Sequence, residues 1–184
     1  MTEDIERVLI AEEEIAAKVR EIAGQINRDY KCKNPMLISV LRGSFIFMAD
    51  LVRALDIDCT IDFLAVSSYG KKSITTGAVK ITKDLDMDIE NRHIIVVEDI
   101  LDSGLTLSYI MNLINAKNPA SIRLCALLDK PARRTVPVYV DYSGFIIPDE
   151  FVVGYGLDYA DRFRNLPYIG VLKPVVYGNN TNLS

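Results

Sequence analysis

Two adjacent carboxylates, Glu98 and Asp99, stand shortly before a small, hydroxyl-rich segment, Asp102 to Thr106. Free backbone N–H groups at the start of a helix bind anions, and Gly104 would let the backbone approach an anion closely. We therefore expect the segment to bind phosphate. Two carboxylates would repel a bare phosphate, but they suit a ligand that also carries sugar hydroxyls or a Mg²⁺-bound pyrophosphate. A phosphorylated ribose combines these groups.

The residues around this segment predict the strand and the helix that hold it. Ile94 to Val97 is a short β-branched run, typical of a strand buried on both faces in a parallel sheet, and it is expected to end at the acidic pair. Beyond Gly104, apolar side chains recur at helical spacing, and Asp102 is expected to cap the turn. Ligands of open α/β sheets bind beyond the carboxyl ends of the strands, where this loop would lie.

A second strand-to-helix turn lies earlier in the chain. Met36 to Leu41 is expected to form a buried strand and Phe45 to Leu55 a helix, with Arg42 and Gly43 in the turn between them. A small backbone next to a positive charge suits the pyrophosphate end of a phosphorylated donor. Helices also commonly begin in this way without any ligand, so the residues alone leave both interpretations open.

The remaining pattern predicts one more amphipathic helix and several strands. The helix spans Ala11 to Tyr30, and the strands span residues 58–67, 121–128, 136–142, 151–155 and 168–172. Residues 67–77 contain few apolar side chains, which is typical either of a solvated hairpin tip or of a functional loop, since loops this long are uncommon in compact domains. Lys130 follows the strand at 121–128, a position at which an isolated lysine is normally a solvated charge.

Length and composition bound the class of protein. The 184 residues are 49% hydrophobic, enough for one domain with a sizeable core. With 21 basic and 25 acidic side chains, the net charge of -4 argues against a general nucleic-acid or anionic-membrane binder. The sequence has no apolar run of about 18 residues and no signal-peptide pattern, so a cytoplasmic protein is expected.

Cysteine and histidine indicate no separate chemistry. Cys32, Cys59 and Cys125 are odd in number and widely spaced, unlike a disulfide framework or a zinc site. The single histidine, His93, stands at the start of the central strand, where we expect a structural role.

The segment Val96 to Thr106 resembles the phosphoribosyl pyrophosphate motif of the type I phosphoribosyltransferases. From roughly residue 8 to 177, the chain is similar to the bacterial hypoxanthine (guanine) phosphoribosyltransferases of that family. This resemblance implies an α/β fold in a single domain, residues 1–184, whose mostly parallel central sheet is flanked by helices. It also implies a small hood, contributed by the N-terminal part and by residues 142–184.

The same resemblance implies an activity in purine salvage. The enzyme would transfer the 5-phosphoribosyl group from phosphoribosyl pyrophosphate to N9 of hypoxanthine, and of guanine, giving IMP or GMP and pyrophosphate. Mg²⁺ would be the cofactor. The partners would be these small-molecule substrates, with no nucleic acid and no membrane, and the protein would form a homodimer or a homotetramer.

The resemblance also assigns roles to residues of this chain. The phosphoribosyl site would contain Glu98, Asp99, Asp102, Ser103, Gly104, Leu105 and Thr106, with Asp102 as the proton acceptor near purine N7. Pyrophosphate would be bound by Arg42, Gly43 and Arg164, where Arg42 replaces the lysine of many members and the peptide before it can be cis. The purine would contact Lys130, Phe151 and Val152, the metal would be held by Glu98, Asp99 and, through water, Asp158, and a lid at residues 67–80 would include Ser68 and Tyr69.

Two alternatives remain beside this interpretation. One is a regulatory, RNA-binding protein on the same fold, in which the phosphoribosyl site senses nucleotide, because a fold alone does not fix a function. Such a protein should show a basic face, whereas this chain is acidic overall. The other is a sister transferase that is specific for xanthine or adenine.

Overall fold

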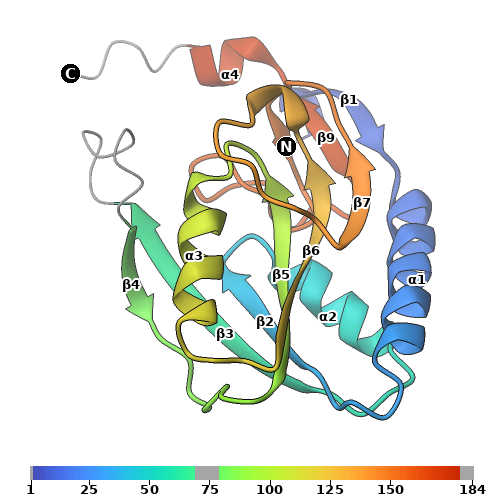
Figure 1. The fold of residues 1–184 in the computed structure, drawn as a ribbon. Helices are drawn as coiled ribbons and strands as arrows, with labels where there is room; N and C mark the ends of the chain where they lie inside the picture. The colour runs from blue at the N-terminus through green and yellow to red at the C-terminus, as the bar shows by residue number, and fades with distance from the viewer. Residues whose placement is uncertain (1, 69–78, 179–184) are drawn as a thin grey trace.

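A six-stranded sheet forms the centre of the computed structural model, which describes residues 2–68 and 79–178 (Figure 1). The strands, in the order β4-β3-β2-β5-β6-β7, are Val79–Lys83, Thr60–Ser68, Met36–Leu41, His93–Leu101, Ser121–Asp129 and Tyr142–Ile146. All neighbours are parallel except β3 and β4, which are antiparallel. The predicted mostly parallel α/β sheet is confirmed.

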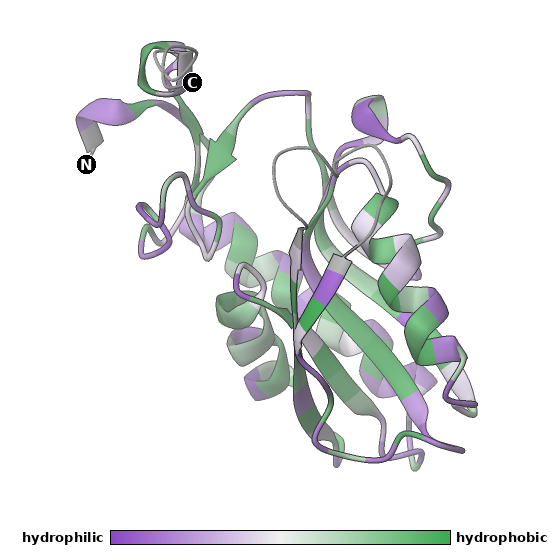
Figure 2. Cartoon of the chain, turned by 90° about the vertical axis from the view of Figure 1, so that its left-hand side faces the viewer, coloured by the Kyte–Doolittle hydropathy of each residue, from purple (hydrophilic) through white to green (hydrophobic). Residues whose placement is uncertain are grey.

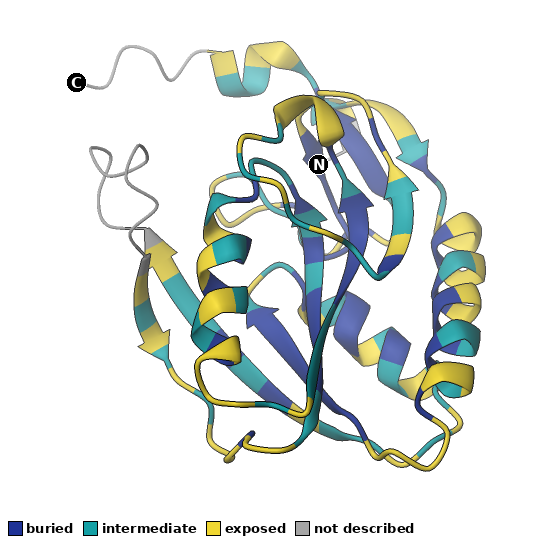
Figure 3. Cartoon of the chain, in the orientation of Figure 1, coloured by how far each residue is buried: buried dark blue, intermediate teal, exposed yellow. Residues whose placement is uncertain are grey.

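Helices cover both faces of this sheet, so its central strands are buried on both sides (Figure 3). Alternate residues of β5 pack in opposite directions: Ile95 and Val97 belong to the core beneath α1 (Glu12–Asp29) and α2 (Phe45–Ala54), whereas Ile94 and Val96 belong to the core beneath α3 (Leu105–Asn115). Two-sided burial explains why residues 94–97 form a continuous apolar run and do not alternate with polar residues. Figure 2 shows the same contrast, with hydrophobic central strands and hydrophilic loops.

A small antiparallel sheet lies near the end of the large sheet where the arrowheads of β5 and β6 lie (Figure 1). It consists of β1 (Ile5–Ile10), β9 (Ile169–Leu172) and β8 (Val152–Val153), in that order. Two short elements flank it, a 3-10 turn at Thr2–Asp4 and the helix α4 at Pro174–Gly178. A second 3-10 turn, Pro131–Arg133, follows β6.

Strand boundaries differ from the sequence-based expectation in the second half of the chain. Residues 136–141 form no strand, and β7 begins only at Tyr142, because residues 134–138 are occupied with supporting a loop of the site described below. Residues 151–155 contain only the two-residue strand β8. In β3, Asp62 and Leu64 are buried while Ile61 is exposed, so the polar Asp62 is on the core side.

The proposed lid lies mostly outside the described residues. Ser68 ends β3, but Tyr69 and the rest of 69–78 fall outside, as do residues 179–184 at the C-terminus. Within the described part of the chain, no helix has both the length and the apolar character needed to span a bilayer.

Candidate active site

Glu98 and Asp99 lie inside strand β5 and not beyond its end. Glu98 pairs with Ala126 of β6, and the ladder continues as far as Leu101. The prediction that the strand ends at the acidic pair was therefore wrong. Backbone pairing does not depend on side-chain charge, so a strand can continue while its last side chains turn toward the crevice at its carboxyl end.

Both carboxylates are withdrawn from bulk water. Asp99 is 9% exposed, and burial raises its pKa to about 6, although the N–H of Ile100 donates to its Oδ1 at 2.8 Å. Burial raises the pKa of Glu98 well above its usual value, and the charge of Asp99 raises it further. Oε2 of Glu98 is buried without a hydrogen-bond partner among the described residues. Such oxygens gain most from a ligand that brings a cation or hydroxyl donors.

This pair of carboxylates fits Mg²⁺ as part of a larger coordination shell. Mg²⁺ prefers oxygen ligands and is commonly held by one or two carboxylates together with substrate phosphates and water. Within residues 2–68 and 79–178, no group of three or more His, Cys, Asp or Glu side chains is arranged to hold a metal by itself. The donor set therefore suits a metal ion that arrives with a phosphorylated ligand.

Residues 102–106 form the predicted turn into α3. Gly104 has φ +85°, a left-handed conformation that favours glycine, and Oγ of Ser103 accepts a hydrogen bond of 3.4 Å from the N–H of Leu105. Asp102 does not cap the turn as expected, and its described partner is Arg133, whose Nε lies 3.1 Å from its Oδ1 in an ion pair. Apart from the long bond between Ser103 and the N–H of Leu105, no side chain caps the start of α3, which leaves its other backbone N–H groups available to an anion.

The chain after β6 supports this turn. Arg134 donates to the carbonyl oxygens of Leu101, Asp102 and Val138, and its guanidinium also forms an ion pair with Asp129. The backbone N–H groups of residues 135 and 136 donate to the carbonyl oxygen of Ser103 at 2.9 and 3.1 Å. Because its carbonyl oxygens are bound in this way, the loop is held in one conformation before any ligand enters.

The turn at Arg42 and Gly43 packs directly against Asp99. A Cβ atom at Gly43 would overlap Oδ2 of Asp99, and one at Gly156, where φ is +101°, would overlap the carbonyl oxygen of Gly43. Three segments that are distant in sequence therefore meet here, at two positions where only glycine leaves room. The Leu41–Arg42 peptide is cis, as the family resemblance allowed.

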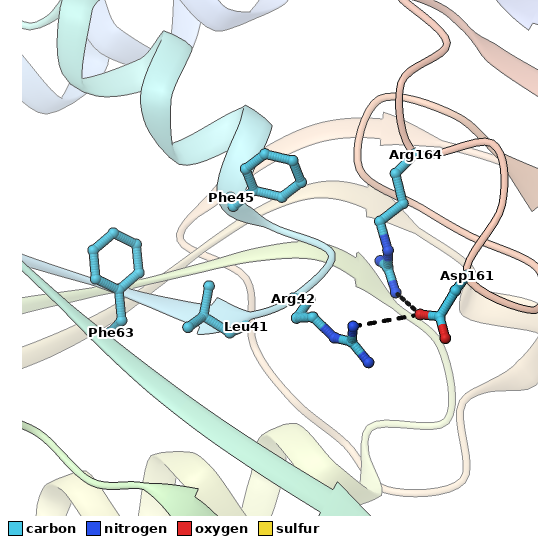
Figure 4. A pocket seen from close by; sticks show the side chains of 6 residues that line it. All are labelled: Leu41, Arg42, Phe45, Phe63, Asp161 and Arg164. Atoms are coloured by element: carbon cyan, nitrogen blue, oxygen red, sulfur yellow. Dashed lines mark ion pairs between the residues drawn. The ribbon is translucent and has the colours of Figure 1, made fainter.

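A pocket of about 580 Å³ opens beside this turn (Figure 4). It is lined by Leu41, Arg42, Phe45, Phe63, Asp161 and Arg164. Nη1 of Arg42 lies 3.4 Å from Oδ1 of Asp161, and Nη2 of Arg164 lies 3.7 Å from the same oxygen. Arg164 also lies 2.6 Å from Oδ1 of Asp158 and donates to the carbonyl oxygen of Gly156 at 2.7 Å. The two predicted pyrophosphate arginines thus share one carboxylate partner, Asp161.

Lys130 is buried, with 6% exposure, and does not form the solvated charge that is usual at a strand exit. Its Nζ donates to the carbonyl oxygen of Glu150 at 2.6 Å, and its backbone N–H donates to that of Leu101 at 2.9 Å. Burial lowers the pKa of Lys130, while the nearby carboxylate of Asp102 acts in the opposite direction. Lys130 therefore links two parts of the site: the loop that contains Asp102, and the segment that precedes Phe151.

Phe151 and Val152 lie at the edge of the small sheet. Val152 pairs with Val171 in β9, which fixes the backbone on which Phe151 is carried. Phe151 is 37% exposed, stacks on Tyr177 and meets Tyr159 edge-on. A partly exposed aromatic face next to a buried lysine is a suitable place for a planar heterocycle.

Sequence reasoning missed several side chains that contact the predicted ones. Asp161 binds both arginines and Arg133 binds Asp102, and neither was assigned a role from the sequence. Gly156 carried no signal, because its close approach to the turn at Gly43 exists only in the folded chain.

Comparison with known proteins relates this geometry to a family. Residues 9–160 match the model of the phosphoribosyl transferase domain. The chain is 52% identical over 177 residues to the hypoxanthine-guanine phosphoribosyltransferase of Bacillus subtilis (strain 168), covering 96% of this chain and 98% of that protein. It is 46% identical to a hypoxanthine phosphoribosyltransferase of Staphylococcus aureus of known structure, with a TM-score of 0.93 over 96% of each chain.

A longer relative shows the same domain within a larger protein. The bifunctional protein TilS/HprT of Listeria monocytogenes is 50% identical over 177 residues, which are 96% of this chain. The chain spans only 27% of the length of that relative. The similarity therefore concerns the part that matches this chain and not the remainder of the bifunctional protein.

Proposed function

The chain belongs to the phosphoribosyl transferase domain family, and from this premise we propose that it is a purine salvage enzyme. It transfers the 5-phosphoribosyl group of phosphoribosyl pyrophosphate to N9 of hypoxanthine or guanine. The bond from ribose C1 to the pyrophosphate oxygen breaks, a bond from C1 to purine N9 forms, and the purine loses one proton. The observation that carries this proposal is the contact of Gly43 with Asp99, which brings the turn beside the arginine pocket against the strand that leads into residues 102–106.

The donor is positioned by two strand-to-helix turns. Backbone N–H groups and hydroxyls of residues 102–106 bind the 5′-phosphate at the start of α3, while Glu98 and Asp99 accept hydrogen bonds from the ribose hydroxyls. The pyrophosphate is bound by Arg42 and Arg164, together with the backbone at Gly43. When it binds, it replaces Asp161 as the anionic partner of both arginines. Fixing both ends of the donor presents C1 to the base in one orientation, which is a large part of catalysis for such a transfer.

Mg²⁺ is part of this proposal. The residues that would hold it are Glu98 and Asp99, with Asp158 contacting it through water, and the bound ion would neutralise charge on the departing pyrophosphate. Raised pKa values of the two buried carboxyls are consistent with a site that is completed by a cation. Arg42 and Arg164 supply the remaining positive charge from this chain.

The base is bound between the loop at Asp102 and the hood. Asp102 accepts the proton near purine N7, and the ion pair with Nε of Arg133, 3.1 Å from its Oδ1, orients this carboxylate. Nζ of Lys130 donates to the exocyclic oxygen of the base, Phe151 stacks on the ring, and the backbone at Val152 contacts its edge. A buried lysine that already has a carbonyl partner is oriented for a second acceptor.

Initial rates with a panel of free bases, phosphoribosyl pyrophosphate and Mg²⁺ test this function, with pyrophosphate release as the signal. Hypoxanthine and guanine should give pyrophosphate and the matching nucleotide, and omission of Mg²⁺ should abolish the reaction. Xanthine should be poor, because it presents an acceptor where guanine presents its 2-amino donor. Turnover of xanthine or adenine alone would replace this function by that of a sister transferase.

The regulatory RNA-binding alternative is not favoured, because relatives that match nearly the whole chain are named as transferases. A homodimer or homotetramer is the assembly we propose from the family resemblance. Sedimentation of the purified chain would distinguish these states from a monomer.

A further inference from the structure

An aromatic side chain from the last helix covers Phe151. The rings of Phe151 and Tyr177 are stacked, with centroids 4.9 Å apart and planes inclined by 21°. Tyr159 meets Phe151 from another side, at 5.5 Å and 89°. Offset-stacked and edge-to-face pairs are the favoured arrangements of aromatic rings, so Phe151 is held in one orientation although it lies at the surface.

Helix α4, which carries Tyr177, is itself attached to the start of the chain. The N–H of Lys173, just before α4, donates to the carbonyl oxygen of Asp4 at 3.0 Å, and its Nζ donates to that of Glu3 at 2.6 Å. Arg162 pairs with the carboxylate of Asp4 at 3.0 Å. The short helix is therefore attached to the N-terminal turn through Lys173.

The side chain of Tyr177 packs on the apolar centre of the small sheet. Together with Tyr159 it contacts the cluster formed by Val153, Phe163, Leu166 and Leu172. Lys130, which follows β6 of the large sheet, is bound on the chain side of Phe151, because its Nζ donates to the carbonyl oxygen of the preceding residue, Glu150. Tyr177 thus covers one face of Phe151 from the small sheet, and the opposite face is the one that the purine would take.

We propose that Tyr177 is a positioning residue of the purine site, which acts by stacking behind Phe151 and fixing its ring plane parallel to the incoming base. This inference rests on the proposed function. Without this support, the ring of Phe151 would rotate freely at the surface. Ordering the ring when the base binds would then cost free energy and weaken base binding. The phosphoribosyl end of the ligand would not be affected.

Three variants of α4 test the proposal. Tyr177→Ala removes the stack, Tyr177→Phe keeps the ring, and Val175→Ala changes a neighbouring exposed side chain of the same helix as a matched control. We expect Tyr177→Ala to raise the KM for hypoxanthine and the Kd for IMP about 2- to 12-fold, the range that corresponds to one aromatic pair. The Kd for ribose 5-phosphate, which has no base, should not change. Tyr177→Phe and Val175→Ala should match the wild-type protein in all three quantities.

A fourth variant loosens the helix without touching the stacked ring. Lys173→Ala removes the side-chain bond to Glu3 and should shift the same two base-dependent constants in the same direction. Unchanged constants in Tyr177→Ala would overturn the proposal, as would tighter purine binding, which would mean that Tyr177 occupies the purine's own place. Equal weakening of IMP and ribose 5-phosphate would also overturn it, because the effect would then be a general loss of structure. Failure of the wild-type protein to bind or form IMP would instead reject the proposed function, and this inference with it.

Discussion

The carboxylate of Asp99 lies against Gly43 so closely that any side chain at position 43 would overlap its Oδ2. Gly43→Ala should therefore push the turn away from Asp99 and lower the free energy of unfolding by about 1–3 kcal/mol, as overpacking does. Displacement of the two halves of the donor site by about 1 Å should reduce kcat/KM at least about 10²-fold. Steady-state kinetics and denaturant titration measure the two effects.

Gly24→Ala is the matched control for this substitution. Gly24 lies inside α1, and the nearest atom to an added Cβ is Nη1 of Arg28 at 3.7 Å. The variant should keep full activity and gain about 0.5–1 kcal/mol of stability, because alanine loses less backbone entropy in a helix. If Gly43→Ala behaved like Gly24→Ala, the close contact with Asp99 would have no functional meaning.

Asp102→Asn should separate proton transfer from donor binding. The amide keeps the shape of the side chain but cannot accept the purine proton, so kcat should fall about 10²-fold or more while the Kd for phosphoribosyl pyrophosphate stays near the wild-type value. Asp149→Asn removes the second carboxylate near Arg133, at 3.6 Å, and should leave kcat nearly unchanged. An undiminished kcat in Asp102→Asn would remove this residue from the chemical step.

Glu98→Gln and Asp99→Asn should act through the metal and the ribose. Each keeps a hydrogen-bonding side chain but loses a charged oxygen ligand, so the Mg²⁺ concentration for half-maximal rate and the KM for the donor should both rise. Rates measured across a Mg²⁺ titration check this. A rate deficit that is the same at every Mg²⁺ concentration would place the two carboxylates outside the metal site.

Lys130→Ala should remove discrimination between purines. Lysine can only donate, so it matches the exocyclic oxygen of hypoxanthine or guanine and leaves the amino group of adenine without an acceptor. A site built around one hydrogen bond rejects an analogue that lacks it by about 10⁴-fold, and we expect the wild-type protein to disfavour adenine on that scale. Phe151→Ala, by contrast, should weaken all purines alike, by about 1–3 kcal/mol, because stacking tolerates any base. Efficient wild-type turnover of adenine would show that Lys130 does not read the base.

The carboxylate of Asp62 should make the free energy of unfolding depend on pH in the acidic range. Burial by itself would raise the pKa of this carboxyl, but N–H donors of Phe63, Met87 and Asp86 and the charge of Lys83 outweigh burial, and the pKa is lowered from 3.8. A group whose folded pKa is lowered stabilises the protein above its unfolded pKa, and this stabilisation is lost as the pH falls through the folded value.

Asp62→Asn should therefore reduce the free energy of unfolding at pH 7, by about 1–3 kcal/mol for a buried hydrogen-bonded group, and the difference from wild type should shrink below pH 3.8. Asp58→Asn, at an exposed acid shortly before the same strand, is the control and should have little effect at either pH. Thermal unfolding at a series of pH values measures both. A constant difference down to the lowest pH would show that the charge of Asp62 is not what stabilises the folded state.

The sequence by itself determined the local units of this protein. Continuous apolar runs such as residues 94–97 and the helical spacing after Gly104 predicted the central strand, α3 and the turn between them, because burial on both faces and a left-handed glycine leave few other conformations. The acidic pair and the hydroxyl-rich loop next to it also indicated the ligand chemistry, since their side chains lie in one short segment.

Only the tertiary structure decided how these units meet. The contact of Gly43 with Asp99, the shared partner Asp161 of two arginines and the stacking of Tyr177 on Phe151 join segments that no local pattern connects. Boundaries near the site were also decided there. The strand β5 continues through Glu98 and Asp99, because pairing with β6 satisfies their backbone groups whatever their side chains do. Local propensity acts within a few residues, whereas these contacts depend on the packing of the whole sheet.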